Sequence, residues 1–203
     1  MTPTGQAHSR RQLFLRVRDT FRGDAGAPAR SAPPTLRPEF LRPPGAAPEP
    51  RFLRLCDRCN DCATACPHHA IVPLSPAYGS ASGTPAILPR HVPCHLCNDL
   101  PCGAACPTGA LTVVPLTEVR MGVARLEPDR CWAVMGQPCD YCVTECPVGP
   151  SALGLDGLHP VVGEACVGCG MCVHICTATT PALRIEPAHA RVAQETRVAA
   201  GRR

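Results

Sequence analysis

The sequence predicts an α+β fold in which short strands and short helices surround cysteine-rich loops. All sixteen cysteines of the 203-residue chain lie between positions 56 and 176, and that span contains only three aromatic residues, Tyr78, Trp132 and Tyr141. The chain also has 25 prolines and 17 glycines, and its apolar runs are short. A domain this poor in large apolar side chains cannot build an adequate core alone, so it recruits metals or disulfides.

The cysteines form four quartets with none left over. In chain order they are Cys56, Cys59, Cys62 and Cys66; Cys94, Cys97, Cys102 and Cys106; Cys131, Cys139, Cys142 and Cys146; and Cys166, Cys169, Cys172 and Cys176. A proline follows each of the first three quartets, and Thr177 follows the last. In two-cluster ferredoxins, three cysteines of such a quartet bind one [4Fe–4S] cluster and the cysteine before the proline binds the other cluster. We therefore predict two bacterial-ferredoxin-like dicluster modules, with all sixteen cysteines as iron ligands of four [4Fe–4S] clusters.

Disulfides and structural zinc are the two alternatives. A disulfide framework would suit an oxidising compartment, but closely repeated C-x-x-C pairs followed by proline serve no purpose in it. Zinc favours two C-x-x-C pairs brought together from separate segments, whereas here three thiols lie within seven to twelve residues. The spacing favours clusters over both.

Spacing alone does not decide which quartets exchange their fourth ligands. Sequential exchange couples the first quartet with the second and the third with the fourth. Nested exchange couples the second with the third and the first with the fourth. We favour nesting, which gives a four-cluster region of residues 51–185 with an inner module of 84–150 and an outer module of 51–75 plus 160–185.

Four short strands are expected around the cysteine loops. They begin at Ala70, Ala86, Thr108 and Ala182, and a further segment at 122–126 is expected to pair with the strand from Thr108 to Val114. A helical turn is expected within each quartet. Trp132 and Tyr141 are expected to cover the third quartet. His68, His69, His95 and His174 are interpreted as neighbours of the ligands or as solvent-facing side chains.

The two ends of the chain differ from the middle. Residues 1–50 are rich in proline and arginine and are expected to be a disordered basic arm, with a short amphipathic helix over 9–22; residues 186–203 are expected to be a flexible tail. This arm could contact a membrane surface peripherally, although no apolar run is long enough to span one. Arg10 and Arg11 resemble a twin-arginine signal, but charged residues follow them where apolar ones are needed. A cytoplasmic location is therefore expected, with periplasmic export through an atypical signal as the alternative.

Several segments together resemble the ferredoxin-type proteins of the NapG/MauM kind. They are Leu41-Arg-Pro-Pro-Gly-Ala, Pro93-Cys-His-Leu-Cys-Asn-Asp-Leu-Pro-Cys and the seven-residue spacing from Cys131 to Cys139. The resemblance covers about residues 41–186 and carries over all sixteen cysteines as cluster ligands. The connection from 108 to 126 also resembles that between the middle quartets of the four-cluster subunits of molybdenum oxidoreductases, which is why nesting is favoured. The N-terminus is more similar to the cytosolic nitrate-reductase accessory ferredoxin.

The resemblance implies an electron-transfer protein that relays electrons between a quinol-oxidising membrane protein and an oxidoreductase, such as a molybdenum enzyme. The alternative is a cytoplasmic maturation factor for an iron–sulfur or molybdenum oxidoreductase. An enzyme with its own substrate site is not expected, because the sequence has neither a G-x-G-x-x-G after a strand nor a P-loop. Nucleic acid is not expected as a partner.

Overall fold

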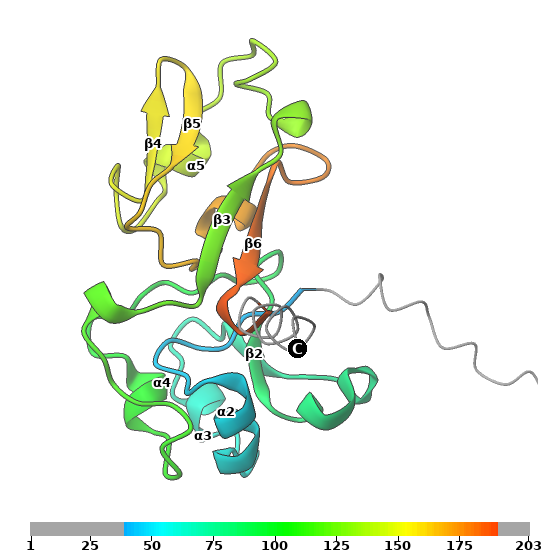
Figure 1. Ribbon diagram of the computed structural model, residues 1–203, viewed down its shortest axis with the longest axis vertical. Coiled ribbons are helices and arrows are strands. Elements are labelled where there is room, and N and C mark those ends of the chain that lie inside the picture. The colour runs from blue at the N-terminus through cyan, green and yellow to red at the C-terminus, as the bar shows by residue number, and fades with distance from the viewer. Residues whose placement is uncertain (1–38, 191–203) are drawn as a thin grey trace, which may run out of the picture. The chain divides into compact units, whose positions relative to one another are not determined.

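The computed structural model describes residues 39–190 (Figure 1). Residues 1–38 of the predicted arm, including its helix at 9–22, and residues 191–203 of the predicted tail therefore lie outside the described residues. The expectation that the disordered arm extends to residue 50 is wrong, because Leu41 bridges to Ile87 and is buried, and a helix begins at Glu49. The expected start of the flexible tail at residue 186 is wrong as well, because Glu186 and Pro187 belong to a strand. The helices are α2 (Glu49–Leu55), α3 (Asp61–Thr64), α4 (Pro101–Ala104), α5 (Tyr141–Thr144) and α6 (Met171–His174). The strands are β1 (Ile71–Pro73), β2 (Pro85–Ile87), β3 (Gly122–Leu126), β4 (Leu153–Asp156), β5 (His159–Val162) and β6 (Leu183–Pro187). Three 3₁₀ turns lie at Pro76–Ala81, Leu116–Glu118 and Pro128–Arg130.

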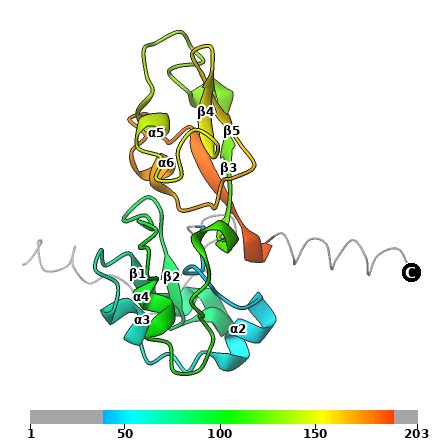
Figure 2. The ribbon, with the colours of Figure 1, turned by 90° about the vertical axis from the view of Figure 1, so that its left-hand side faces the viewer.

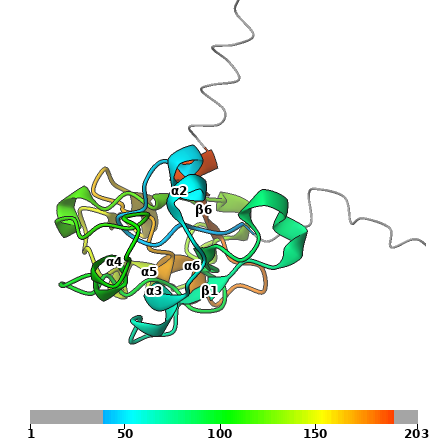
Figure 3. The ribbon, with the colours of Figure 1, turned by 90° about the horizontal axis from the view of Figure 1, so that it is seen from below.

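These elements gather in two lobes (Figures 1 and 2). The first lobe, residues 39–119, contains α2, α3, α4 and the β1–β2 pair. The second lobe, residues 120–187, contains α5, α6 and the strands β3 to β6. Seen from below, α2, α3 and β1 of the first lobe lie toward the viewer (Figure 3). The α+β fold of short elements around cysteine loops is confirmed. No helix described between residues 39 and 190 has both the length and the apolar character needed to cross a bilayer.

Each strand has one antiparallel partner. β1 pairs with β2, placing Ile71 opposite Ile87. β3 pairs with β6 along five residues, from Gly122 opposite Pro187 to Leu126 opposite Leu183. β4 and β5 form a hairpin whose turn begins at Gly157. The strands expected near Ala70, Ala86, Gly122 and Ala182 are thus confirmed, each within a residue of its expected start.

The strand expected from Thr108 to Val114 is wrong, and so is its pairing with 122–126. Leu111 makes only an isolated bridge with Ala46. The neighbouring backbone groups bond the same upstream segment, since Thr112 N–H donates to the Gly45 carbonyl and Ala47 N–H donates to the Ala110 carbonyl. β3 pairs with β6 instead.

The segment from Leu41 to Ala46 holds the first lobe together. Leu41 exchanges two backbone hydrogen bonds with Ile87 of β2. Gly45 lies against the backbone of Thr112 with φ +73°, and a Cβ there would meet the Thr112 carbonyl oxygen at 1.9 Å. Only glycine permits this close approach and this left-handed conformation together.

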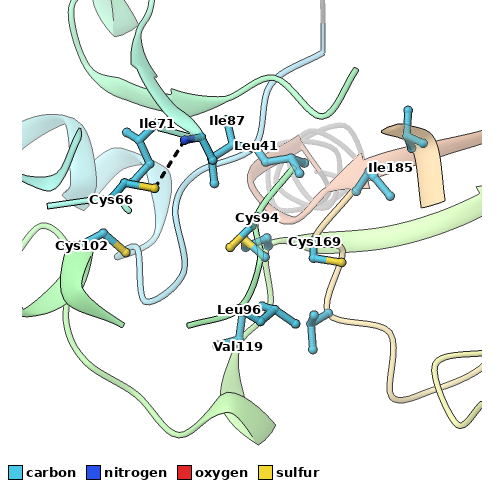
Figure 4. Close-up of a cluster of buried hydrophobic side chains, with 14 of the residues drawn as sticks. Leu41, Cys66, Ile71, Ile87, Cys94, Leu96, Cys102, Val119, Cys169 and Ile185 are labelled. Atoms are coloured by element: carbon cyan, nitrogen blue, oxygen red, sulfur yellow. Dashed lines mark hydrogen bonds between the residues drawn. The ribbon is translucent and has the colours of Figure 1, made fainter. Parts of the chain in front are cut away.

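The lobes meet through backbone contacts near two cysteines. Cys94 N–H of the first lobe donates to the Cys169 carbonyl of the second at 3.0 Å. Where the chain enters the second lobe, Met121 N–H donates to the Val167 carbonyl of the same lobe at 2.9 Å. One cluster of buried apolar side chains runs through this junction, including Leu41, Leu96 and Val119 from the first lobe and Ile185 from the second. Figure 4 shows these side chains around Cys94 and Cys169. The two lobes therefore share a core.

Candidate metal centres

Each quartet contains one short helical turn that carries its third cysteine. These turns are α3 with Cys62, α4 with Cys102, α5 with Cys142 and α6 with Cys172. The fourth cysteine follows four residues later, after the chain has turned away. The helical turn in each quartet was expected from the sequence and is confirmed.

The structure collects the sixteen cysteines into four groups of four, each lining one cavity. Group 1 is Cys56, Cys59, Cys62 and Cys106; group 2 is Cys66, Cys94, Cys97 and Cys102; group 3 is Cys131, Cys139, Cys142 and Cys176; group 4 is Cys146, Cys166, Cys169 and Cys172. The cavities are of similar size, with volumes of about 300 to 360 Å³ including the open space at their mouths. In every group, three cysteines come from one quartet and the fourth comes from another.

The nested exchange favoured from the sequence is wrong, because the groups follow the sequential alternative. Cys66 lies with the second quartet and Cys106 with the first, while Cys146 lies with the fourth and Cys176 with the third. The inner module of 84–150 and the outer module of 51–75 plus 160–185 are therefore not units of ligand exchange. Two strand pairings accompany this arrangement. The β1–β2 pair folds the second quartet back onto the first, and the long β3–β6 pair brings the fourth quartet back to the third.

Burial raises the pKa of several thiols. The pKa of Cys62 rises to about 12 through burial, with further increases from the neighbouring charges of Cys106 and Cys56. Burial also raises the pKa of Cys94 to about 12 and that of Cys169 to about 11. A thiolate binds metal and a thiol does not, so these cysteines need a cationic centre beside them to lose their protons.

Backbone N–H groups point at the cysteine sulfurs. Ala70 donates to Cys66 Sγ, Leu111 to Cys106 Sγ and Ala182 to Cys176 Sγ, each at 3.4 Å. The first of these is the dashed line beside Cys66 in Figure 4. Ala124 of β3 donates to Cys166 Sγ at the same distance. These bonds stabilise sulfur that carries negative charge, as cluster ligands do.

Cys106 shows the effect of such donors most clearly. Burial would raise its pKa, but the Leu111 N–H and the Thr108 hydroxyl outweigh burial, so the pKa is lowered overall. Thr108 Oγ1 lies 3.6 Å from the sulfur. The sequence did not single out Thr108. Its position two residues after the last cysteine of the quartet is the signal that could have done so.

The cysteine groups follow one another in a row. Cys62 of group 1 and Cys102 of group 2 are close enough for their charges to interact, and so are Cys172 of group 4 and Cys142 of group 3. Groups 2 and 4 meet at the junction of the lobes, where the charges of Cys94 and Cys169 interact (Figure 4). The spatial order is therefore 1, 2, 4, 3, with groups 1 and 3 at the ends.

The histidines near the cysteines are exposed. His68 and His95 stack face to face, with ring centroids 3.9 Å apart, beside group 2. Burial lowers the pKa of His95, and the charges of His68 and His174 lower it further. Because His69 and His174 are exposed as well, all four histidines lie at the surface as expected.

Trp132 and Tyr141 both line the cavity of group 3, as expected, although each is about half exposed. Pro160 of β5 lines the same cavity. The β4–β5 hairpin was missed from the sequence. Gly157, the first residue of the two-residue turn and flanked by apolar strand residues, is the signal that could have revealed it.

The residues present fit [4Fe–4S] clusters. Four soft sulfur donors surround each cavity, apolar side chains form much of its wall, and N–H groups bond to several of the sulfurs. Within residues 39–190, no three His, Cys, Asp or Glu side chains come close enough together to hold a single metal ion. The sulfurs of each group line a cavity, as a polynuclear centre requires. Fold and site together define a ferredoxin-type iron–sulfur protein.

Comparison with known proteins identifies the family. The family model for a 4Fe-4S dicluster domain matches residues 55–110, which hold the first two quartets. The ferredoxin-type protein NapG of Escherichia coli (strain K12) is 38% identical over 162 residues, covering 72% of this chain and 70% of NapG. The methylamine utilization ferredoxin-type protein MauM of Paracoccus denitrificans (strain Pd 1222) is 40% identical over 159 residues, covering 72% of this chain and 71% of MauM. The chain belongs to this NapG/MauM family of ferredoxin-type proteins.

A more distant relative is part of an oxidoreductase. A selenate reductase subunit of Mesobacillus selenatarsenatis is 29% identical over 104 residues, covering 48% of this chain and 32% of the relative. No solved structure matches the chain significantly.

Proposed function

We propose that this chain is an electron-transfer protein that carries four [4Fe–4S] clusters, one in each cysteine group. All sixteen cysteines would be iron ligands, and the last cysteine of each quartet would bind the cluster of the neighbouring quartet. The dicluster match over residues 55–110 supports this arrangement, because that segment contains the whole of groups 1 and 2.

The observation that carries the proposal is the row of cysteine groups in the order 1, 2, 4, 3. A [4Fe–4S] cluster accepts and releases one electron without a change of ligands. The chain's own residues would hold successive clusters close together and exclude water between them. Cys94 and Cys169, in contact at the junction, would join the two pairs of clusters into one relay.

The proposed partners are redox proteins, one at each end of the row. The resemblance to NapG and MauM supports a donor on the quinol side, such as a quinol-oxidising membrane protein, and a molybdenum or related oxidoreductase as acceptor. The likeness to part of a selenate reductase agrees with an accessory role beside an oxidoreductase. We propose no substrate site on this chain itself.

Metal and sulfide analysis tests the proposal. Protein purified without oxygen should contain about sixteen iron atoms and sixteen acid-labile sulfides, four of each per cluster. Dithionite should bleach its visible absorption, and hexaammineruthenium(III) should restore it. Bound zinc without sulfide would refute the cluster assignment. A full set of clusters that dithionite cannot reduce would refute electron transfer and favour the maturation factor.

The cytoplasmic location remains a prediction from Arg10, Arg11 and the charged residues that follow them. Cell fractionation tests it directly. Full-length protein found in the periplasm, and lost from there when both arginines are changed to lysine, would contradict it.

A further inference from the structure

The two ends of the row of cysteine groups have different surfaces. At group 1 the cavity is lined by Asp57, Arg58 and Asn60, which are all exposed, and Cys59 is exposed with them. At group 3 the cavity is lined by Trp132, Tyr141 and Pro160. The exposed residues at the mouth of the cavity are therefore mainly polar at the group 1 end and aromatic at the group 3 end.

Exposed apolar side chains are concentrated at the group 3 end. Of the eight large hydrophobic residues that are exposed in the described part of the chain, six lie between Trp132 and Val161. Trp132 is 42% exposed, Tyr141 54%, Leu155 47% and Leu158 77%. Isolated exposed hydrophobic residues are ordinary, but a contiguous set marks an interaction site.

The β4–β5 hairpin joins these residues to the cavity. Leu155 stands directly opposite Pro160 in the pairing register, so both lie on the same face of the hairpin. Pro160 lines the group 3 cavity with Trp132 and Tyr141. Leu158 lies in the turn next to them. We call Trp132, Tyr141, Leu155 and Leu158 the hairpin patch. Val161 is also exposed, but it pairs with Gly154 and so belongs to the opposite face.

Acidic residues are frequent in the sequence around the hairpin patch, and all of them except Glu127 are exposed. Between positions 127 and 164 the chain has six acidic residues and one basic residue, Arg130. Asp140 directly precedes Tyr141, whereas Asp156 stands opposite His159 and so lies on the same face of the hairpin as Val161. Within residues 39–190 neither carboxylate takes part in an ion pair, whereas Glu127 pairs with Arg130 and Arg184. The patch thus has an apolar centre, with a negatively charged rim formed by Asp140 beside it and Asp156 behind the hairpin.

We propose that the hairpin patch is the docking site of a redox protein whose cofactor edge lies in an apolar face with a basic rim. This inference rests on the proposed electron-transfer function. Charge complementarity selects the occupant. Two copies of this chain facing each other through the patch would bring like charges together, and an anionic membrane surface would be repelled in the same way.

A docking face of this kind would serve a transient complex. Electron-transfer encounters bury less surface than stable complexes do. Trp132 and Tyr141 lie between solvent and the group 3 sulfurs, so a partner that contacts them comes close to the end of the row. The acidic rim would speed the encounter at low salt, and this attraction would fall as salt screens it.

Cytochrome c is a suitable probe, because its haem edge is ringed by lysines. Dithionite-reduced protein is mixed with ferric cytochrome c in a stopped-flow instrument, and one electron passes from the protein to the ferric haem, which becomes ferrous. The variant L155Q/L158Q should lower the second-order rate constant roughly tenfold. The control V161Q changes an apolar residue that is as exposed as Leu155 but lies on the other face. It should leave the rate within about twofold.

Two further measurements separate docking from chemistry. Binding of zinc-substituted cytochrome c, which accepts no electron, should weaken by the same factor in L155Q/L158Q and not in V161Q. Reduction of hexaammineruthenium(III), a small ion that needs no docking face, should be unchanged in both. The variant D140N/D156N should slow cytochrome c reduction at low salt and flatten its dependence on salt.

Several outcomes would overturn the inference. These are an equal loss in V161Q, no loss in L155Q/L158Q, or a loss confined to D57N/D61N at the other end. A wild-type dimer that L155Q/L158Q converts to a monomer would make the patch a self-interface instead. If the wild-type protein reduces neither cytochrome c nor hexaammineruthenium(III), the proposed function itself fails. If the wild-type protein reduces both acceptors and the patch variants reduce cytochrome c at the wild-type rate, the function stands and the docking site is wrong.

Discussion

The two lobes hold the same number of cysteine groups, but they differ in the other contacts that support the fold. The ten largest fully buried side chains all lie between Leu41 and Val119, in the first lobe. The second lobe buries cysteines, alanines and a smaller set of larger apolar side chains, and its Trp132 and Tyr141 stay half exposed; the larger buried side chains are Met121, Leu153, Val167, Val173, Leu183 and Ile185. The first lobe therefore contributes most of the large side chains of the shared core, whereas the second lobe depends more on its metal sites.

Cluster removal should therefore affect the lobes unequally, and this is the largest effect expected. Metal binding and folding are one equilibrium where ligands come from distant segments. When iron is removed by a chelator under oxidising conditions, backbone amides of residues 120–187 should lose nearly all protection from hydrogen exchange. Amides of Leu41, Phe52 and Ile87 in the first lobe should keep more of theirs. Equal loss in both lobes would show that the apolar core of the first lobe does not stand without its clusters.

The pairing of quartets gives a second test, in which each lobe is the control for the other. Cys106→Ala should disturb only the cluster of group 1, and Cys176→Ala only that of group 3. Each variant should bind about twelve iron atoms in place of sixteen. Trp132, the only tryptophan, lines the group 3 cavity, and a cluster there would quench its fluorescence. Emission should rise in Cys176→Ala and stay low in Cys106→Ala. A rise in Cys146→Ala alone would point to a different exchange of ligands.

The sequence predicted which cysteines of a quartet lie together far better than it predicted how the quartets combine. Grouping sixteen cysteines into quartets depends only on local spacing, and each quartet does contain its helical turn. Which quartet completes which depends on strand pairing between distant segments. Arg125 of β3, for example, stands opposite Arg184 of β6. No local pattern encodes a pairing of that range, and β pairing in particular is decided by context.

The expected strand at 108–114 failed for a related reason. Thr112 and Val113 have high β propensity, but propensity does not say which partner is available. Gly45 and Ala47 occupy the backbone groups of this segment, and Gly45 can do so because it lacks a side chain. The motif around Gly45 carried the family resemblance in the sequence. Its structural role became visible only in the structure: its backbone bonds Ile87 before the second quartet and the segment 110–112 after it.

The two lobes also differ in the burial of their ion pairs. In the first lobe, Arg42 forms a bidentate pair with Glu49, at 2.6 and 2.9 Å, and donates to Thr84 Oγ1 and the Pro85 carbonyl. Its guanidinium lies 4.4 Å from the centre of the Phe52 ring. The side chain is only 5% exposed, so it joins α2 to β2 inside the core. In the second lobe, the pair of Arg125 with Glu186 lies at the surface, where Arg125 is 51% exposed.

Arg42→Met should destabilise α2 by about 3–5 kcal/mol, because it leaves the Glu49 carboxylate without its partner in a largely buried site. Arg125→Met, the matched surface variant, should cost less than about 1 kcal/mol. Hydrogen exchange of the α2 and β3 amides in the cluster-loaded protein measures the free energy of local opening in each case. Equal effects would mean that burial does not distinguish these two pairs.

The smallest expected effect concerns a single hydroxyl beside one cluster. Thr108 Oγ1 lies 3.6 Å from Cys106 Sγ. A hydrogen bond to sulfur stabilises the reduced, more negative cluster and raises its reduction potential. Thr108→Val keeps the shape of the side chain and removes the donor. A bond worth about 1 kcal/mol corresponds to a few tens of millivolts for one electron, so the group 1 potential should fall by no more than that.

Redox titration followed by EPR spectroscopy measures the shift, and the potential of group 3 in the other lobe is the internal reference. If both potentials move together, the change has spread through the protein, and the hydroxyl does not act on its own cluster.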